Sequence, residues 1–383
     1  MLNKQILIAP DSFKESMTAQ QASEAIIRGF RSIVPDTWKF DSLPMADGGE
    51  GTMQSLADAL GGRIYETFVT GPLGDAVTAT YAISGDQSTA IIEMAEASGL
   101  HLVPENQRNP LVTTTYGTGE LIKAALNHGV SKIILGIGGS ATNDGGAGMI
   151  QALGGRFYDE QAQPLKHGAS PLLELADIDV THIDARLQST HISVACDVDN
   201  PLLGPTGASA VYGPQKGADD ISVATLDQAL NHYHNVLASV TGHNVKAVPG
   251  AGAAGGLGAS LLAFLNAALE PGIQIVLEET RFYERVKHAD LVITGEGKID
   301  RQTIYGKTPV GVAQAAKHYH VPVIALCGTL GTDYEDVLKH GIDAIFSIVN
   351  EPGQPLQQTL RNGETSLEAT SKNIASVLKW PYD

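Results

Sequence analysis

Short apolar segments alternate with amphipathic helical patterns at both ends of the chain. The apolar segments have the length of buried strands and lie at residues 5–9, 38–43, 290–294, 321–327 and 344–349. A capping box of Thr18 and Gln21 begins the first helical pattern. Further helices are expected near residues 309–318, 334–340 and 367–378. Repeated β-α units of this kind predict a doubly wound parallel sheet.

The middle of the chain has a different pattern. Strand-like segments at 64–70, 77–83 and 89–94 are separated only by tight turns, which predicts antiparallel pairing. Beyond them the sequence predicts helices near 118–128, 221–240 and 253–269 and a core strand at 191–196. We therefore predict an α/β fold in two domains. Residues 1–70 and 285–383 share one parallel sheet in the order 2-1-3-4-5, and residues 71–284 form an inserted domain.

A glycine-rich loop follows the apolar segment Ile133–Leu135 and leads into a helix. Glycines let backbone N–H groups approach a bound anion, and a helix N-terminus favours negative charge. Hydroxyl, amide and carboxylate groups suit phosphate oxygens or hydrated magnesium. We expect nucleotide binding by Gly138, Gly139, Ser140, Asn143, Asp144 and Gly145. The alternative, that these glycines only permit a tight turn, stays open.

Polar residues also follow the strands predicted near the two chain ends. Ligands bind beyond the carboxyl ends of strands in open α/β sheets. We therefore assign substrate binding to Asp11, Ser12, Asp47, Gly48 and Gly49, and cofactor binding to Glu296 and Lys298.

An acid pair and several lysines are candidates for the chemistry. Asp197 and Asp199 follow a predicted strand at a spacing of two, so both can face one side and hold Mg²⁺ or accept a hydroxyl proton. Asp197 and Asp199 can equally form a solvated turn before a proline. Lys14, Lys216 and Lys298 lie near glycine loops or strand ends, where they could neutralise phosphate or carboxylate, or remain solvated.

Two other nucleotide motifs deserve comparison. Gly136, Gly138 and Ala141 fit a relaxed dinucleotide fingerprint, with Asp159 placed where a ribose-binding acid is expected, so an NAD-dependent hydroxy-acid dehydrogenase remains an alternative. A ligand-binding sensor without turnover is another. The run GKT at 306–308 lacks the preceding strand and the first glycine of a P-loop, which excludes that motif.

The composition indicates which classes of binding partner and which cellular compartment to expect. The net charge of −17 disfavours nucleic acid and anionic membranes. Cys196 and Cys327 lack metal-ligand spacing and indicate a reducing compartment. The apolar run near the N-terminus is too short for a secretory signal, so we expect a soluble, cytoplasmic protein. Homo-oligomerisation stays open.

Several long motifs, taken in order, closely resemble the type-1 glycerate kinase family. They are APDSFKES (9–16), ADGGEGT (46–52), VTGPLG (69–74), GIGGSATNDGG (136–146), ACDVDNPL (195–202), GPQKG (213–217), PGAGAAGG (249–256) and TGEGKID (294–300). The resemblance implies a flavodoxin-like domain with an inserted α/β domain, and phosphorylation of D-glycerate by ATP and Mg²⁺.

The resemblance leaves the individual catalytic roles open. Our candidates for catalysis are Asp197, Asp199 and Lys14, with the two aspartates also as metal ligands. Lys14 or Lys298 should hold the substrate carboxylate. The closest family motifs favour 2-phosphoglycerate as the product, in sugar-acid or glyoxylate catabolism, with a glycerate 3-kinase as the alternative.

Overall fold

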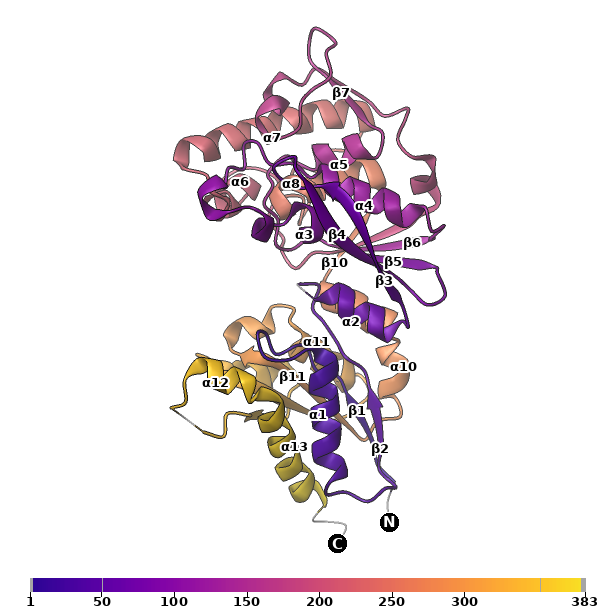
Figure 1. Cartoon of the computed structure of the whole chain (residues 1–383), viewed down its shortest axis with the longest axis vertical. Coiled ribbons are helices and arrows are strands. Elements are labelled where there is room, and N and C mark those ends of the chain that lie inside the picture. Colours follow the sequence, from indigo (N-terminus) through magenta and orange to yellow (C-terminus); the bar gives the residue numbers. More distant parts are fainter. Residues whose placement is uncertain (1–2, 50, 352, 380–383) are drawn as a thin grey trace. The chain divides into compact units, whose positions relative to one another are not determined.

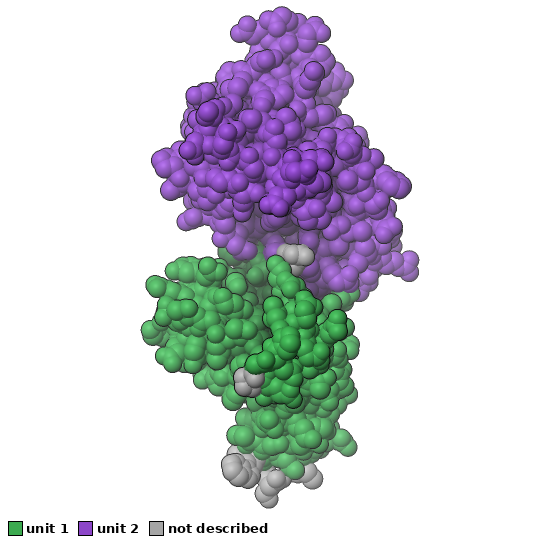
Figure 2. Space-filling view, turned by 60° about the vertical axis from the view of Figure 1, so that its left-hand side comes forward, with its two compact units in different colours: residues 1–47, 58–60, 271–383 green, residues 48–57, 61–270 purple. Residues whose placement is uncertain are grey.

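The computed structural model describes residues 3–49, 51–351 and 353–379. The chain divides into two compact units, shown in Figures 1 and 2. Unit 1 contains residues 1–47, 58–60 and 271–383, and unit 2 contains residues 48–57 and 61–270. Both have mixed α/β architecture. No helix among the described residues has the length and apolarity needed to cross a membrane.

Unit 1 is built on a five-stranded sheet in the order β13-β12-β11-β1-β2. Its strands are β1 (Gln5–Ile8), β2 (Lys39–Ser42), β11 (Leu291–Ile299), β12 (Val323–Leu330) and β13 (Ala344–Ser347). All neighbouring strands are parallel. Read along the chain, this is the predicted order 2-1-3-4-5, with strands from both chain ends paired through β1 and β11.

Alternate residues of each strand point to opposite faces of the sheet, so apolar strand residues lie on both faces. Helices pack against the sheet of unit 1 and bury them. Ile6, Ile8 and Ile293 join one buried cluster with apolar residues of α1 (Ala19–Arg31) and α13 (Gly363–Lys379). The predicted Thr18–Gln21 capping box is present at the start of α1. The remaining helices of this unit are α9 (Gly272–Glu279), α10 (Phe282–Val286), α11 (Thr308–Lys317) and α12 (Leu356–Arg361). Residues Tyr334–His340 form a 3₁₀ helix, η7, where the pattern predicts an ordinary helix.

Unit 2 is built on a six-stranded sheet in the order β10-β9-β6-β5-β4-β3. Its strands are β3 (Arg63–Thr70), β4 (Ala76–Ile83), β5 (Thr89–Glu93), β6 (Lys132–Gly136), β9 (His191–Ala195) and β10 (Ala268–Glu270). The strands β3, β4 and β5 pair antiparallel, as their tight turns predict. From β5 to β10 the pairing is parallel. A separate hairpin joins β7 (Arg156–Tyr158) and β8 (Asp177–Asp179).

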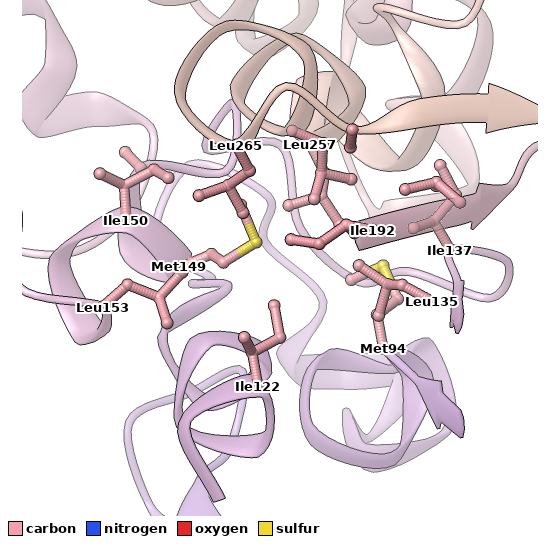
Figure 3. Packing of buried hydrophobic residues seen from close by; sticks show 14 of the residues in the cluster. Met94, Ile122, Leu135, Ile137, Met149, Ile150, Leu153, Ile192, Leu257 and Leu265 are labelled. Carbon is pink, nitrogen blue, oxygen red and sulfur yellow. The ribbon is translucent and has the colours of Figure 1, made fainter. Parts of the chain in front are cut away.

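The core of unit 2 lies between this sheet and its helices. The helices are α2 (Thr52–Ala59, of which residues 52–57 belong to unit 2), α3 (Ala95–Ser98), α4 (Tyr116–Leu126), α5 (Ala147–Ala152), α6 (Ala208–Tyr212), α7 (Asp220–Thr241) and α8 (Ala253–Leu265). Figure 3 shows part of the core, where Ile122 of α4, Met149 of α5 and Leu257 of α8 lie among side chains of β6 and β9. The central strand β6 is buried on both faces, which fixes the position of the loop that follows it.

The unit limits differ from the expected boundaries at 70/71 and 284/285. Residues 63–70 form β3, which pairs with β4 along its whole length and therefore belongs to the sheet of unit 2. Helices α9 and α10 both belong to unit 1, where Phe282 is fully buried, so this unit begins again at residue 271. The predicted helix over 253–269 ends at Leu265, because Asn266 takes a left-handed conformation (φ 48°), and residues 268–270 form β10 instead.

Candidate functional site

A pocket of about 390 Å³ opens at the carboxyl ends of β6 and β9 in unit 2. Its lining includes Gly138, Gly139 and Ser140 of the glycine loop, Asp197 after β9, and Lys216. Gly48 and Gly49 contribute as well. This is where ligands bind in open parallel sheets, and the predicted loop supplies one wall. Glu50, in the same motif as Gly48, lies outside the described residues.

A second hollow of about 440 Å³ is also lined by the glycine loop. It shares Gly48, Gly49, Gly138 and Gly139 with the first pocket. Its remaining polar lining, however, is acidic, with Glu93 and Glu96, and includes His101. Anionic groups are therefore better accommodated in the first pocket, where Lys216 lies.

The backbone of the glycine loop is hydrogen-bonded to the end of α3 and to the segment that follows it. Leu100 N donates to Gly139 O (2.8 Å), and Ala141 N donates to Ser98 O (2.9 Å). Gly139 has a φ of 73°, in the left-handed region that favours glycine. These backbone hydrogen bonds restrain the loop, and restraint of this kind limits the ordering cost of binding.

Two glycines of the loop, Gly138 and Gly145, have different structural roles. A Cβ added at Gly138 would find no atom within 4 Å, so this position faces open space beside the two pockets. At Gly145 (φ 66°) a Cβ would come within 2.7 Å of the Tyr233 ring. Gly138 thus leaves room for a ligand, whereas Gly145 lies behind the pocket wall and makes room for internal packing.

Asn143 and Asp144 point into the protein. Asp144 is fully buried and accepts hydrogen bonds from Thr115 N (2.8 Å) and Thr115 Oγ1 (2.9 Å). Burial raises the pKa of Asp144, and the hydrogen bonds oppose that shift. Asn143 is also buried, and its amide donates to Ser209 Oγ (3.0 Å). Neither residue lines the two pockets beside the loop, although both were assigned to cofactor binding from the sequence.

Lys216 lies behind Ser140 and is only 1% exposed. Its Nζ donates to Ser140 Oγ (2.8 Å) and to Thr142 O (2.6 Å). Burial lowers the pKa of Lys216 to about 7, and the charge of Asp144 partly opposes this shift. The sequence presents Lys216 only as one of several lysines near glycine loops, and nothing in its local spacing shows that this one is buried.

Asp197 and Asp199 are exposed beyond the end of β9. Asp197 lines the pocket; Asp199 is not among its lining residues. Within the described ranges no group of three or more acidic, His or Cys side chains could hold a metal ion. Mg²⁺ bound by one or two carboxylates plus substrate phosphates does not need such a group, so Asp197 fits as a ligand beside a phosphate.

A second set of polar residues lies at the carboxyl ends of β1 and β11 in unit 1. Asp11 accepts from Thr308 Oγ1 (2.6 Å), and Glu296 accepts from Thr303 Oγ1 (2.8 Å). Lys307 Nζ lies 3.6 Å from Glu296. Lys307 and Thr308 come from the excluded GKT run, so that segment contributes to this set without forming a P-loop.

Two carboxyl groups of this set, those of Asp11 and Glu296, have raised pKa values. Burial, together with the charge of Asp47, raises the pKa of Asp11 to about 6. Burial also raises the pKa of Glu296 to about 7, against the effects of Lys307 and Thr303. The structure thus brings the predicted residues Asp11, Asp47 and Glu296 into one electrostatic group.

The other residues predicted in unit 1 are more exposed. Ser12 is half-buried and donates its N–H to Asp11 (2.6 Å). Lys14 is exposed. Lys298 is 59% exposed and pairs with Asp300 at 2.8 Å, so its charge is partly neutralised within the protein.

The geometry around Asp159 does not fit a dinucleotide site. Asp159 follows β7, which pairs only with β8, in a sheet separate from that of β6. Its Oδ1 accepts from Gln161 N (2.9 Å) and Gln163 N (2.8 Å), which makes it the centre of an exposed turn. A ribose-binding acid should follow a strand of the sheet that carries the glycine loop.

Comparison with known proteins gives one consistent result. The sequence profile of the glycerate kinase family matches residues 6–379. A glycerate kinase of Halalkalibacterium halodurans is 57% identical, with 98% of both chains covered. A glycerate 2-kinase of Escherichia coli is 51% identical, with 97% of both chains covered. A crystal structure from Salmonella typhimurium LT2, described as a candidate glycerate kinase 2, is 50% identical and covers both chains fully, with a TM-score of 0.92.

Proposed function

Because this chain belongs to the glycerate kinase family, we propose that it transfers the γ-phosphoryl group of ATP to the 2-hydroxyl of D-glycerate, giving 2-phosphoglycerate and ADP. The family supports the kinase reaction. The glycine-loop pocket with Lys216 behind Ser140 carries the assignment to this chain's own residues. The choice of the 2-hydroxyl is supported by the Escherichia coli relative, which bears the name glycerate 2-kinase.

The reaction asks the protein for positioning and charge neutralisation. The glycerate hydroxyl oxygen forms a bond to the γ-phosphorus, the bond from that phosphorus to the bridging oxygen breaks, and ADP leaves with the bonding electrons. The hydroxyl proton passes to a carboxylate, for which Asp197 or Asp199 is our candidate. Gly138 leaves space for the phosphates, Gly139 lines the pocket beside it, and Ser140 offers a hydroxyl at the pocket wall.

We assign Mg²⁺ to the same acid pair, of which Asp197 lines the pocket and Asp199 is exposed outside its lining. The acid that does not accept the hydroxyl proton serves as the ligand. When bound, the ion neutralises charge on the phosphates during transfer. The protein's own part is to hold Asp197 just beyond the end of β9, where it lines the pocket. A role in sugar-acid or glyoxylate catabolism and a cytoplasmic location belong to the same proposal. The free thiols of Cys196 and Cys327 fit a reducing compartment.

The decisive experiment mixes the purified chain with ATP, Mg²⁺ and D-glycerate and follows ADP release. Omission of glycerate is the control for simple ATP hydrolysis. Coupling to enolase without phosphoglycerate mutase then identifies the product, since enolase acts at once on the 2-phosphate. A strict requirement for added mutase would show a glycerate 3-kinase. Absence of glycerate-dependent ADP release would overturn the proposal as a whole.

A further inference from the structure

The environment of Lys216 is unusual for a buried cation. Its ammonium lies inside unit 2, and the hydrogen bonds that it donates to described residues go to two neutral oxygens, Ser140 Oγ and Thr142 O. Burying a charge without a partner of opposite charge is costly. The nearest acidic influence on it comes from Asp144, whose oxygens are already occupied by N–H and O–H donors from Thr115 and the start of α5.

The backbone around Lys216 is built to keep it there. Lys216 ends the short 3₁₀ helix η5 (Pro214–Lys216), and Gly217 follows in a left-handed conformation (φ 96°). A Cβ at Gly217 would lie 2.4 Å from Arg108 O, so only glycine allows this close approach. A buried cation held by such specific packing needs a compensating interaction elsewhere.

Ser140 provides the connection to the pocket. Its Oγ accepts the hydrogen bond from Lys216, which leaves the hydroxyl hydrogen of Ser140 available for donation. Ser140 lines the pocket beside Gly138 and Gly139. A hydroxyl that accepts from an ammonium group becomes a stronger donor, because hydrogen bonds in a chain polarise one another.

We infer that Ser140 and Lys216 together form an anion site, in which the Ser140 hydroxyl donates to an anionic oxygen of a bound substrate and the Lys216 ammonium supplies the neutralising charge from behind. This inference rests on the proposed function. The anionic oxygen belongs either to a nucleotide phosphate or to the glycerate carboxylate. Lys216 is a positioning residue, since it acts through Ser140.

The test combines binding and stability in Lys216→Met. Methionine matches the length of the lysine stem without its charge. Calorimetric titration with MgADP and, separately, with D-glycerate should show about 10–100-fold weaker binding of one of the two, as expected for loss of a charge-assisted hydrogen bond. The thermal midpoint should stay the same or rise, because a buried charge has been removed. A merely structural lysine would give the opposite pattern, with lower stability and unchanged affinity.

Matched variants complete the experiment. Lys123→Met removes an exposed lysine from helix α4 of the same unit and should change neither affinity nor stability. Ser140→Ala should weaken the same substrate as Lys216→Met, and the double variant should lose less than the sum of the two single effects. Lys216→Arg should recover little, since a guanidinium does not fit the enclosed space.

Each outcome decides a separate question. Weaker MgADP binding places a phosphate at the pair, and weaker glycerate binding places the carboxylate there. If wild type binds both substrates and both Lys216→Met and Ser140→Ala also bind them normally, the inference is overturned while the proposed function stands. If wild type binds neither substrate, the proposed function fails, and the inference with it.

Discussion

Two glycines of one loop should respond in opposite ways to the same substitution. At Gly138 an alanine methyl would enter open space next to both pockets, with no protein atom within 4 Å. Gly138 does not have a left-handed φ, so alanine is free of backbone strain there. We therefore expect Gly138→Ala to leave the free energy of unfolding within about 0.5 kcal/mol of wild type, or to raise it by as much as about 1 kcal/mol.

Gly145→Ala should instead destabilise the protein. Its left-handed φ of 66° costs alanine about 1–2 kcal/mol. Its methyl would also lie 2.7 Å from the ring of Tyr233, which is fully buried, and overpacking of this kind costs about 1–3 kcal/mol. The two terms predict a loss of about 2–5 kcal/mol, and a thermal midpoint lower by about 4–20 °C for a domain of this size.

In steady-state kinetics the order should be reversed: Gly138→Ala should be impaired and Gly145→Ala should be close to wild type. In Gly138→Ala the methyl displaces a bound phosphate or its neighbour by about 1 Å, so kcat/KM for ATP should fall about 10–100-fold. Below its melting range, Gly145→Ala should retain a KM for ATP close to wild type. Urea denaturation and steady-state kinetics on both variants measure these values. A fully active Gly138→Ala, or a Gly145→Ala as stable as wild type, would refute the division of labour within the loop.

Three further predictions concern other parts of the site. Asp197→Asn should lower kcat at least about 10²-fold with an unchanged circular dichroism spectrum, and near-normal turnover would assign this acid to the surface turn. The native state holds the proton of Glu296 more tightly than the unfolded chain, because burial raises its pKa from 4.5 to about 7, so the unfolding free energy should fall as the pH rises across that window. In Glu296→Gln the unfolding free energy, measured by urea titration at pH 5 and at pH 8, should change less between the two pH values than in wild type. An equal change in both proteins would contradict the prediction. Ala254, a pocket-lining residue with a φ of 52°, should gain about 1 kcal/mol of stability when changed to glycine, measured as a higher thermal midpoint; an unchanged or lower midpoint would show that its left-handed conformation is not strained.

Much of the fold could be predicted because local patterns and long-range packing agree. After Lys132 the segment that becomes β6 is apolar, as expected for a parallel strand buried on both faces. The tight turns at 71–75 and 84–87 favour antiparallel neighbours. The three-residue strands β7, β8 and β10 were not predicted, since three residues carry no measurable period. Their pairing depends on neighbours that are distant in sequence.

The candidate site was harder to predict, because a residue belongs to it only if its side chain points into the pocket. The residue type alone does not show that direction. The GGSATNDGG run contains several groups suited to phosphate, and the sequence gives them equal standing. In the structure Ser140 lines the pocket, whereas Asn143 and Asp144 are buried. The Asn143 amide donates to Ser209, and the Asp144 carboxylate accepts from Thr115. A loop can expose only some of its side chains on one side, and the remainder must be accommodated by the core.

Burial also determines which lysine can act on a bound anion. In a chain with a net charge of −17, an exposed lysine such as Lys298 pairs with a nearby carboxylate, which partly neutralises its charge. Lys216 escapes such pairing because the fold places it 76 residues away from Ser140 in sequence but 2.8 Å from it in space. Its charge is therefore directed at the pocket through one hydroxyl, in surroundings where screening by water is weak. An anionic substrate that meets an acidic protein surface can be retained there, because a local buried cation outweighs a distant, screened net charge.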